Sequence, residues 1–199
     1  KCEIYTDVDG VFTADPRVVP EARKLEEITY DEMLELATSG AKVLHSRSVE
    51  LAKKYGVQMV VRSSLNESEG TVVKEVVKME KMLITGVAAD KNTARISVIG
   101  VEDKPGIAFK IFHRLAKNGI NVDIILQSVG RDGTKDISFT VSQDDLKEAV
   151  AVLEENKEAL TIQEITSNAD VAKVAIVGAG MMSNPGVASQ MFEALYSYG

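Results

Sequence analysis

The chain has 199 residues, 45% hydrophobic and 27% charged, a composition typical of a soluble globular protein with one large or two small domains. Its formal net charge of −7 argues against non-specific binding to nucleic acid, and no apolar run approaches the length of a membrane span. The single cysteine, Cys2, excludes an intrachain disulfide and fits a reducing compartment, so we expect a cytoplasmic protein without nucleic-acid or membrane partners.

The first part of the chain, residues 1–65, has the pattern of mixed α/β structure. A short strand is expected at Cys2–Thr6 and leads into the polar loop TDVDG. Apolar spacing predicts a helix over Tyr30–Thr38, a second helix over Arg47–Tyr55 and then a strand at Gln58–Arg62. The order of strands and helices predicts a sheet with helical connections.

A polar, turn-like stretch follows this first block. It covers Asn66–Gly70 (NESEG), and the charged residues Thr71–Lys81 after it are predicted to form a connector. Met82–Ala88 is predicted to be a strand that passes into the next domain.

Residues 94–167 have the pattern of a compact α/β unit. Their order is β-α-β-β-α-β, the ferredoxin-like arrangement. The expected elements are a strand at Ile96–Val101, a helix from Pro105 to Lys117, a strand at Asn121–Val129, a turn at Gly130–Lys135, a strand at Asp136–Val141, a helix at Asp144–Asn156 and a strand at Thr161–Thr166.

The segment 174–199 repeats the segment 96–119. Gly100 corresponds to Gly178, the pair Pro105-Gly106 corresponds to Pro185-Gly186, and a two-residue insertion falls in the loop. Such a repeat predicts that the same structural unit occurs twice. The second copy is expected to begin with a strand at Val171–Gly178 and a helix from Pro185. Because the sequence stops before that copy is complete, we expect the chain to be a piece of a larger protein.

Two groups of polar residues in the first block could bind a phosphate. Asp7 and Asp9 follow a predicted strand, and ligands in open α/β sheets bind beyond the carboxyl ends of strands. Arg17 would supply positive charge, and Lys42 could do so if it lies near that loop. On spacing alone the alternatives stay open: the TDVDG loop can be an ordinary turn, and Lys42 can lie along the apolar surface.

Other motifs point less clearly to chemistry. His45 and His113 lack a second ligand at metal-binding spacing and are interpreted as structural. The glycines of Gly178–Ser183 are interpreted as the loop of the repeat, because no acidic ribose-binding residue can follow them. The Pro-Gly helix start with Asp103 nearby could bind a free amino acid through its carboxylate and ammonium groups, or could simply start the helix well.

The strings TDVDG, TADPR, YDEMLELA and GAKVLH resemble the C-terminal part of the catalytic domain of aspartate kinases, in the amino-acid kinase family. VEDKPG and INVDIILQS resemble the paired ACT domains of those enzymes, and the resemblance covers essentially the whole chain. It implies the C-terminal part of an α/β sandwich over residues 1–65, a connector over 66–81, a first ferredoxin-like ACT domain over 82–170 and a truncated second one over 171–199.

The resemblance also implies a nucleotide site. Its expected ATP contacts are Thr6, Asp7, Phe12, Arg17 and Lys42, with Mg²⁺ bridging the phosphates. The family commonly has Tyr at the position of Phe12, so a hydrogen bond from that hydroxyl is absent here. The family's proline after the LH pair is Ser46 in this chain, which affects the local turn but leaves Lys42 in place.

The ACT resemblance implies an effector site for lysine, often with threonine, where ACT units of two subunits meet. Homodimers or another subunit pairing are therefore expected. The expected effector contacts are Asp103, Gly106, Ala108, Asn121, Val122, Asp123 and Gln127.

The function implied is ATP-dependent phosphorylation of L-aspartate to 4-phospho-L-aspartate, the first step toward lysine, threonine and methionine. The family's N-terminal phosphate motif and aspartate-binding residues have no counterpart here, so the chain alone is expected to be inactive. Two alternatives are a non-catalytic regulatory subunit built of ACT domains and an amino-acid kinase with another phosphate acceptor; the ACT pair disfavours the latter.

Overall fold

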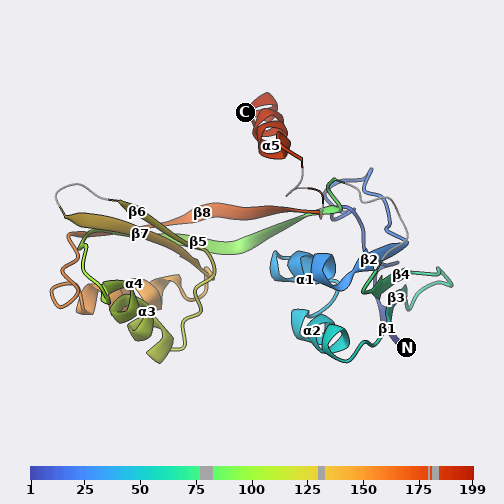
Figure 1. The fold of residues 1–199 in the computed structure, drawn as a ribbon, viewed down its shortest axis with the longest axis horizontal. Helices are drawn as coiled ribbons and strands as arrows, with labels where there is room; N and C mark the ends of the chain where they lie inside the picture. Colours follow the sequence, from blue (N-terminus) through green and yellow to red (C-terminus); the bar gives the residue numbers. More distant parts are fainter. Residues whose placement is uncertain (77–82, 130–132, 179, 181–183) are drawn as a thin grey trace. The chain divides into compact units, whose positions relative to one another are not determined.

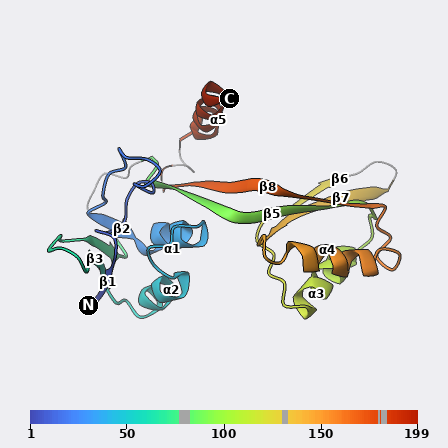
Figure 2. The same ribbon diagram turned by 180° about the vertical axis from the view of Figure 1, so that it is seen from behind.

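The computed structural model describes residues 1–76, 83–129, 133–178, 180 and 184–199. The chain forms two compact units (Figures 1 and 2). Unit 1 comprises Lys1–Asp90 with Val174–Gly199, and unit 2 comprises Lys91–Lys173. Within the described ranges, no helix has both the length and the apolar character needed to cross a bilayer.

Unit 1 contains a four-stranded sheet in the order β1-β3-β4-β2. β1 pairs parallel to β3, β3 pairs antiparallel to β4, and β4 pairs parallel to β2. The strands are β1 (Cys2–Thr6), β2 (Glu27–Thr29), β3 (Met59–Ser63) and β4 (Thr71–Lys74). The prediction for Cys2–Thr6 is confirmed, and the strand predicted at Gln58–Arg62 is present one residue later.

The predicted connector at Thr71–Lys81 is wrong over its first four residues. They form β4, in which Thr71 and Val73 are buried and alternate with more exposed neighbours. The β-branched sequence Thr-Val-Val suits a half-buried strand, and its pairing on both sides overrides the charged residues that follow. Residues 77–81 lie outside the described residues. The short strand β2 was not predicted, because three residues are too few to show a period.

Two helices accompany this sheet, and both lie on the same side of it in Figures 1 and 2. α1 spans Tyr30–Thr38 as predicted, and it starts at a capping box formed by Thr29 and Glu32. α2 spans Ser46–Lys54, one residue earlier than predicted. Their buried residues join the sheet in one apolar core that includes Met33, Leu36, Val49, Val61 and Val73.

Unit 2 has the predicted β-α-β-β-α-β order, with the sheet order β6-β7-β5-β8. α3 and α4 lie on one face of this sheet (Figure 1). Their apolar sides meet the buried side chains of the strands in a second core, which includes Ile96, Ile111, Leu115, Phe139 and Leu153. The elements are β5 (Gly86–Glu102), α3 (Ile107–Lys117), β6 (Ile125–Val129), β7 (Thr134–Val141), α4 (Leu146–Glu155) and β8 (Glu164–Val177).

Three strand boundaries differ from the predictions. β5 begins at Gly86 and continues through the predicted strand Ile96–Val101, while Met82 lies outside the described residues. The strands predicted separately at Thr161–Thr166 and Val171–Gly178 are one strand, β8, because pairing beside β5 extends it through polar residues that favour a turn. β6 begins only at Ile125.

The hairpin between β6 and β7 is described only in part. Residues 130–132 of the predicted turn lie outside the described residues, and Lys135 belongs to β7 rather than to the turn.

The repeat is visible in the backbone. α3 follows Gly106, which has φ 89°, and α5 (Val187–Tyr198) follows Gly186, which has φ 99°. A left-handed residue at this position favours glycine. Both helices therefore start in the same way, one residue after the glycine of the Pro-Gly pair.

Candidate functional site

The first candidate site lies where β1 ends. β1 and β3 are parallel, so their carboxyl ends share one edge of the sheet. The Thr6 hydroxyl accepts the Val8 N–H at 3.2 Å and donates to Asp7 at 3.0 Å. The Thr6 carbonyl accepts the Ser64 N–H at 2.7 Å, from the end of β3. These bonds fix the orientation of Thr6 and Asp7, two of the predicted ATP contacts.

Arg17 lies in the loop that follows. Its guanidinium donates twice to Asp15, with Nε–Oδ1 at 3.0 Å and Nη2–Oδ2 at 2.9 Å. The hydrogen bond from Arg17 lowers the pKa of the Asp15 carboxyl. The pKa of Arg17 is raised, mainly by its hydrogen bond to Asp15 and in smaller part by the charge of Asp7. The Arg17 side chain is nevertheless 81% exposed.

Phe12 lies near the start of the same loop and is half-buried. Its backbone forms an isolated antiparallel bridge with Lys24. Thr6 thus ends β1 and Asp7 follows it, while Phe12 and Arg17 belong to the loop that comes next in the chain.

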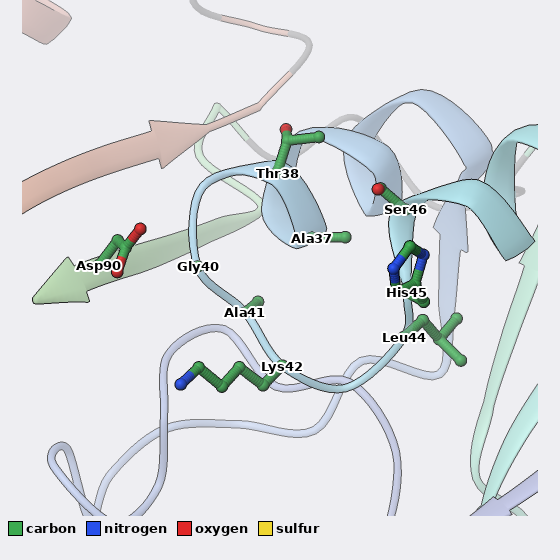
Figure 3. Close-up of a pocket in the computed structure, with 9 residues that line it drawn as sticks. All are labelled: Ala37, Thr38, Gly40, Ala41, Lys42, Leu44, His45, Ser46 and Asp90. Carbon is green, nitrogen blue, oxygen red and sulfur yellow. The ribbon is translucent and has the colours of Figure 1, made fainter. Parts of the chain in front are cut away.

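Lys42 lies beside a cavity of about 420 Å³ (Figure 3). The cavity is lined by the end of α1, by the loop before α2 with Lys42 and His45, by Ser46 at the start of α2, and by Asp90 of β5. In Figure 3 the Lys42 side chain extends away from the His45 ring. None of the other four predicted ATP contacts lines this cavity. The sequence did not predict a role for Asp90, which lies 48 residues beyond Lys42 and comes close only through the fold.

The two histidines have structural contacts. His45 Nδ1 accepts the Arg47 N–H at 3.2 Å and so caps the N-terminus of α2. Ser46, in place of the family's proline, is the first residue of α2, so the helix starts here without it. His113 stacks on Phe109 with ring centroids 5.1 Å apart.

The described residues contain no cluster of three or more His, Cys, Asp or Glu side chains that could hold a metal ion. Asp9 instead accepts a hydrogen bond from Asn66 at 2.7 Å. Mg²⁺ keeps several waters and usually binds one or two carboxylates together with substrate phosphates. A single carboxylate at this edge, that of Asp7, fits an ion carried mainly by nucleotide phosphates.

The predicted effector residues lie in two places in unit 2. Asp103 and Gly106 belong to the turn from β5 into α3, and Ala108, in the first turn of α3, packs against the core. The left-handed φ of Gly106 accounts for a glycine at this position. Crowding does not account for it, since a Cβ there would meet no atom within 4 Å. Asn121, Val122 and Asp123 form the link from α3 to β6, and Gln127 lies on β6, at the edge of the sheet.

Both carboxylates of this set already have lysine partners. Asp103 pairs with Lys135 at 2.9 Å, and the Lys135 side chain is only 11% exposed. Asp123 pairs with Lys173 at 2.5 Å. The Asp103 carboxylate is therefore already paired with an ammonium of the chain itself, and its contact with the ammonium of an effector stays a prediction.

Two buried threonines of unit 1, which the sequence did not single out, form hydrogen bonds to distant segments of that unit. The Thr71 hydroxyl contacts both ends of the loop that carries Phe12 and Arg17. The Thr85 hydroxyl donates to Glu32 at 2.6 Å, the carboxylate of the capping box of α1. No local pattern marks either residue, because their partners lie 46 to 60 residues away in sequence.

Protein-family models match both parts of the chain. The model described as the amino acid kinase family matches residues 1–63, and an ACT domain model matches residues 96–156 and 174–199, which contain the two copies of the repeat. The chain is 54% identical over 196 residues to an aspartokinase of Bacillus sp. (strain MGA3), covering 98% of this chain and 48% of that protein.

A solved regulatory subunit of aspartate kinase from Thermus thermophilus is 42% identical, with a TM-score of 0.54, over 58% of this chain and 76% of that one. The chain belongs to the aspartokinase family. Aspartokinase III of E. coli, solved with aspartate and ADP, matches over 97% of this chain and 43% of that one, with a TM-score of 0.78 and 27% identity. The same enzyme solved with lysine and aspartate gives a TM-score of 0.69 and 29% identity over 88% of this chain and 39% of that one.

Membership of this family confirms the predicted fold class: part of an amino-acid kinase α/β domain with ferredoxin-like ACT units. The chain spans about half the length of the curated relatives it matches.

Proposed function

We propose that this chain supplies part of the nucleotide site and the regulatory ACT units of an enzyme that phosphorylates L-aspartate to 4-phospho-L-aspartate with ATP. The observation that carries this proposal is the match of 98% of this chain to an aspartokinase, which includes the segment from Thr6 at the end of β1 through Asp7 and Phe12 to Arg17. E. coli aspartokinase III, a relative with the same fold, has been solved with aspartate and ADP.

In this proposal the residues of the chain act by position and charge. Phosphoryl transfer requires a held nucleotide and compensation of the charge on its phosphates. Arg17, whose guanidinium is largely exposed, and Lys42 would neutralise the phosphates, while Thr6 and Asp7 hold their orientation through bonds at the end of β1. A Mg²⁺ ion carried by the nucleotide, next to Asp7, would supply further positive charge.

Equilibrium binding of MgADP tests the nucleotide part of the proposal. Calorimetry should show saturable binding by the wild-type chain, weakened about tenfold by Lys42→Ala, since one charge-assisted hydrogen bond contributes about 1.5–3 kcal/mol. Lys54→Ala, at the far end of α2, is the matched control and should leave the affinity unchanged. No binding by the folded wild type would contradict this part. With MgATP and L-aspartate, the chain alone is expected to show no turnover.

The regulatory part of the proposal concerns lysine, threonine or both. Its candidate contacts are the seven residues of the β5–α3 turn, the α3–β6 link and β6 described above. E. coli aspartokinase III has been solved with lysine, which makes lysine the first effector to titrate. Pairing of ACT units between subunits predicts that the chain is dimeric at micromolar concentration, which analytical ultracentrifugation can measure with and without lysine.

The second candidate is a non-catalytic, amino-acid-binding regulatory subunit built of ACT domains. The match to a regulatory subunit over 76% of its length favours it. The two candidates differ in their ligands: a regulatory subunit should bind lysine or threonine without binding MgADP. Binding of both kinds of ligand would favour the kinase.

A further inference from the structure

The loop that carries Phe12 and Arg17 leaves the sheet region and returns to the same point. The Leu25 N–H donates to the Val11 carbonyl at 2.8 Å, so the residues Val11–Leu25 form a closed loop with a narrow neck. Next to the neck, the Thr13 N–H donates to the Arg23 carbonyl at 2.9 Å. The geometry of the neck therefore determines where the rest of this loop points.

One side chain from a distant part of the chain holds both ends of the neck. The Thr71 hydroxyl accepts the Val11 N–H at 2.8 Å and donates to the Leu25 carbonyl at 2.6 Å. Thr71 is 0% exposed and belongs to β4, 60 residues from Val11 and 46 from Leu25. A hydroxyl is suited to this place because it can accept one hydrogen bond and donate another.

The residue before the neck is shaped around the same hydroxyl. Gly10 has φ 142°, and a Cβ on it would lie 2.5 Å from the Thr71 Oγ1. The close approach of Thr71 thus requires the glycine at the end of the TDVDG loop. If Thr71 only filled space, its hydroxyl would not need to form hydrogen bonds with the backbone at both ends of one loop.

We propose that Thr71 is a positioning residue of the nucleotide site: its hydroxyl fixes the neck of the Val11–Leu25 loop and thereby the placement of Phe12 and Arg17. This inference rests on the proposed nucleotide-binding function. It assigns a functional role to a buried residue of β4, outside the loop that would touch the nucleotide.

The test compares Thr71→Val, which keeps the shape and removes the hydroxyl, with Thr71→Ser, which keeps the hydroxyl. Thr93→Val is the matched control, because Thr93 is also buried but lies in unit 2. The two measurements are the hydrogen exchange rate of the Val11 amide and the affinity for MgADP. Thr71→Val should speed exchange and weaken binding, each about tenfold, because it removes two hydrogen bonds and leaves the Val11 N–H and the Leu25 carbonyl without the Thr71 hydroxyl. Thr71→Ser and Thr93→Val should stay within about twofold of wild type.

Several results would overturn the inference. One is a Thr71→Val variant that binds MgADP as tightly as the wild type, whatever the exchange rate of its Val11 amide. Another is an equal loss of MgADP affinity in Thr71→Ser and Thr71→Val. If Thr71→Val does not fold, the second variant is Gly10→Ala, whose Cβ would push against the Thr71 hydroxyl. Unchanged affinity for MgADP in this variant overturns the inference. Weaker MgADP binding together with faster hydrogen exchange of the Val11 amide supports it. Absence of MgADP binding in the wild type would instead contradict the proposed function, and the Val11 amide would then still report whether Thr71 holds the neck.

Discussion

Replacing Asp103 with alanine should destabilise unit 2 as well as remove a proposed effector contact. The Lys135 ammonium, on a side chain only 11% exposed, would lose its partner at 2.9 Å. Removing one partner of a fully buried pair costs roughly 3–5 kcal/mol, while exposed pairs contribute about 0.2–1 kcal/mol. Because Asp103 is 55% exposed, we expect a loss between these limits, about 2 kcal/mol in the free energy of unfolding.

Urea unfolding followed by far-UV circular dichroism, with the core methyl resonances of Ile111 and Leu115 as local probes, measures this loss. The double variant Asp103→Ala/Lys135→Met should regain most of the stability, because it leaves no unpaired ammonium. A single variant as stable as wild type would refute the reasoning, and so would a double variant no more stable than the single one. The result also decides whether weaker effector binding by Asp103→Ala reflects a lost contact with the effector or a loss of stability of unit 2.

Three further predictions concern unit 1. Gly70→Ala should destabilise by at least about 2 kcal/mol, because its Cβ would overlap a carbonyl oxygen of β3, whereas Gly56→Ala, with positive φ but open space, should cost only about 1 kcal/mol; thermal unfolding compares them. Arg17→Ala should raise the pKa of the Asp15 carboxyl toward its ordinary value in an NMR titration, because Arg17 lowers that pKa in the folded protein. The Arg17–Asp15 pair therefore stabilises the fold at pH values above the unfolded-state pKa of Asp15. This stabilisation is lost as the pH falls through the folded-state pKa of Asp15. Thr29→Ala should cost about 1 kcal/mol in urea unfolding by removing the capping box of α1, and an unchanged midpoint would contradict that role.

Elements with a full local signal were predictable. The helix at Tyr30–Thr38 has a capping box and a regular apolar face, and it is present with the predicted bounds. The helices of both repeats follow a Pro-Gly pair, and the structure gives both glycines the same left-handed conformation. Here the sequence contains the reason for the structure within a few residues.

Elements whose reason lies elsewhere in the chain were missed. β4 was predicted as a connector because Thr71–Lys74 is short and followed by charges, and only its pairing with β3 and β2 makes it a strand. β8 continues through Ser167–Asp170, a polar stretch that looks like a turn in isolation. The roles of Thr71 and Thr85 depend on partners that no local pattern reveals.

The predicted site residues divide in the same way. Thr6, Asp7, Phe12 and Arg17 are close in sequence and follow one another from the end of β1 into the next loop, and their contact with a nucleotide stays a prediction. Asp103 was expected to be open to an ammonium, and the structure gives it the ammonium of Lys135 from the next strand of the sheet. A pairing between strands cannot be read from spacing alone.

The measurement that tests the central claim most directly is an NMR titration of the isotope-labelled chain with MgADP. The account predicts that the backbone amides of Thr6, Asp7, Phe12, Arg17 and Lys42 shift together and saturate with one dissociation constant. It also predicts that amides of α4, in unit 2, shift little. Absence of saturable shifts in the folded chain, or shifts confined to unit 2, would contradict the claim that this chain carries part of a kinase nucleotide site.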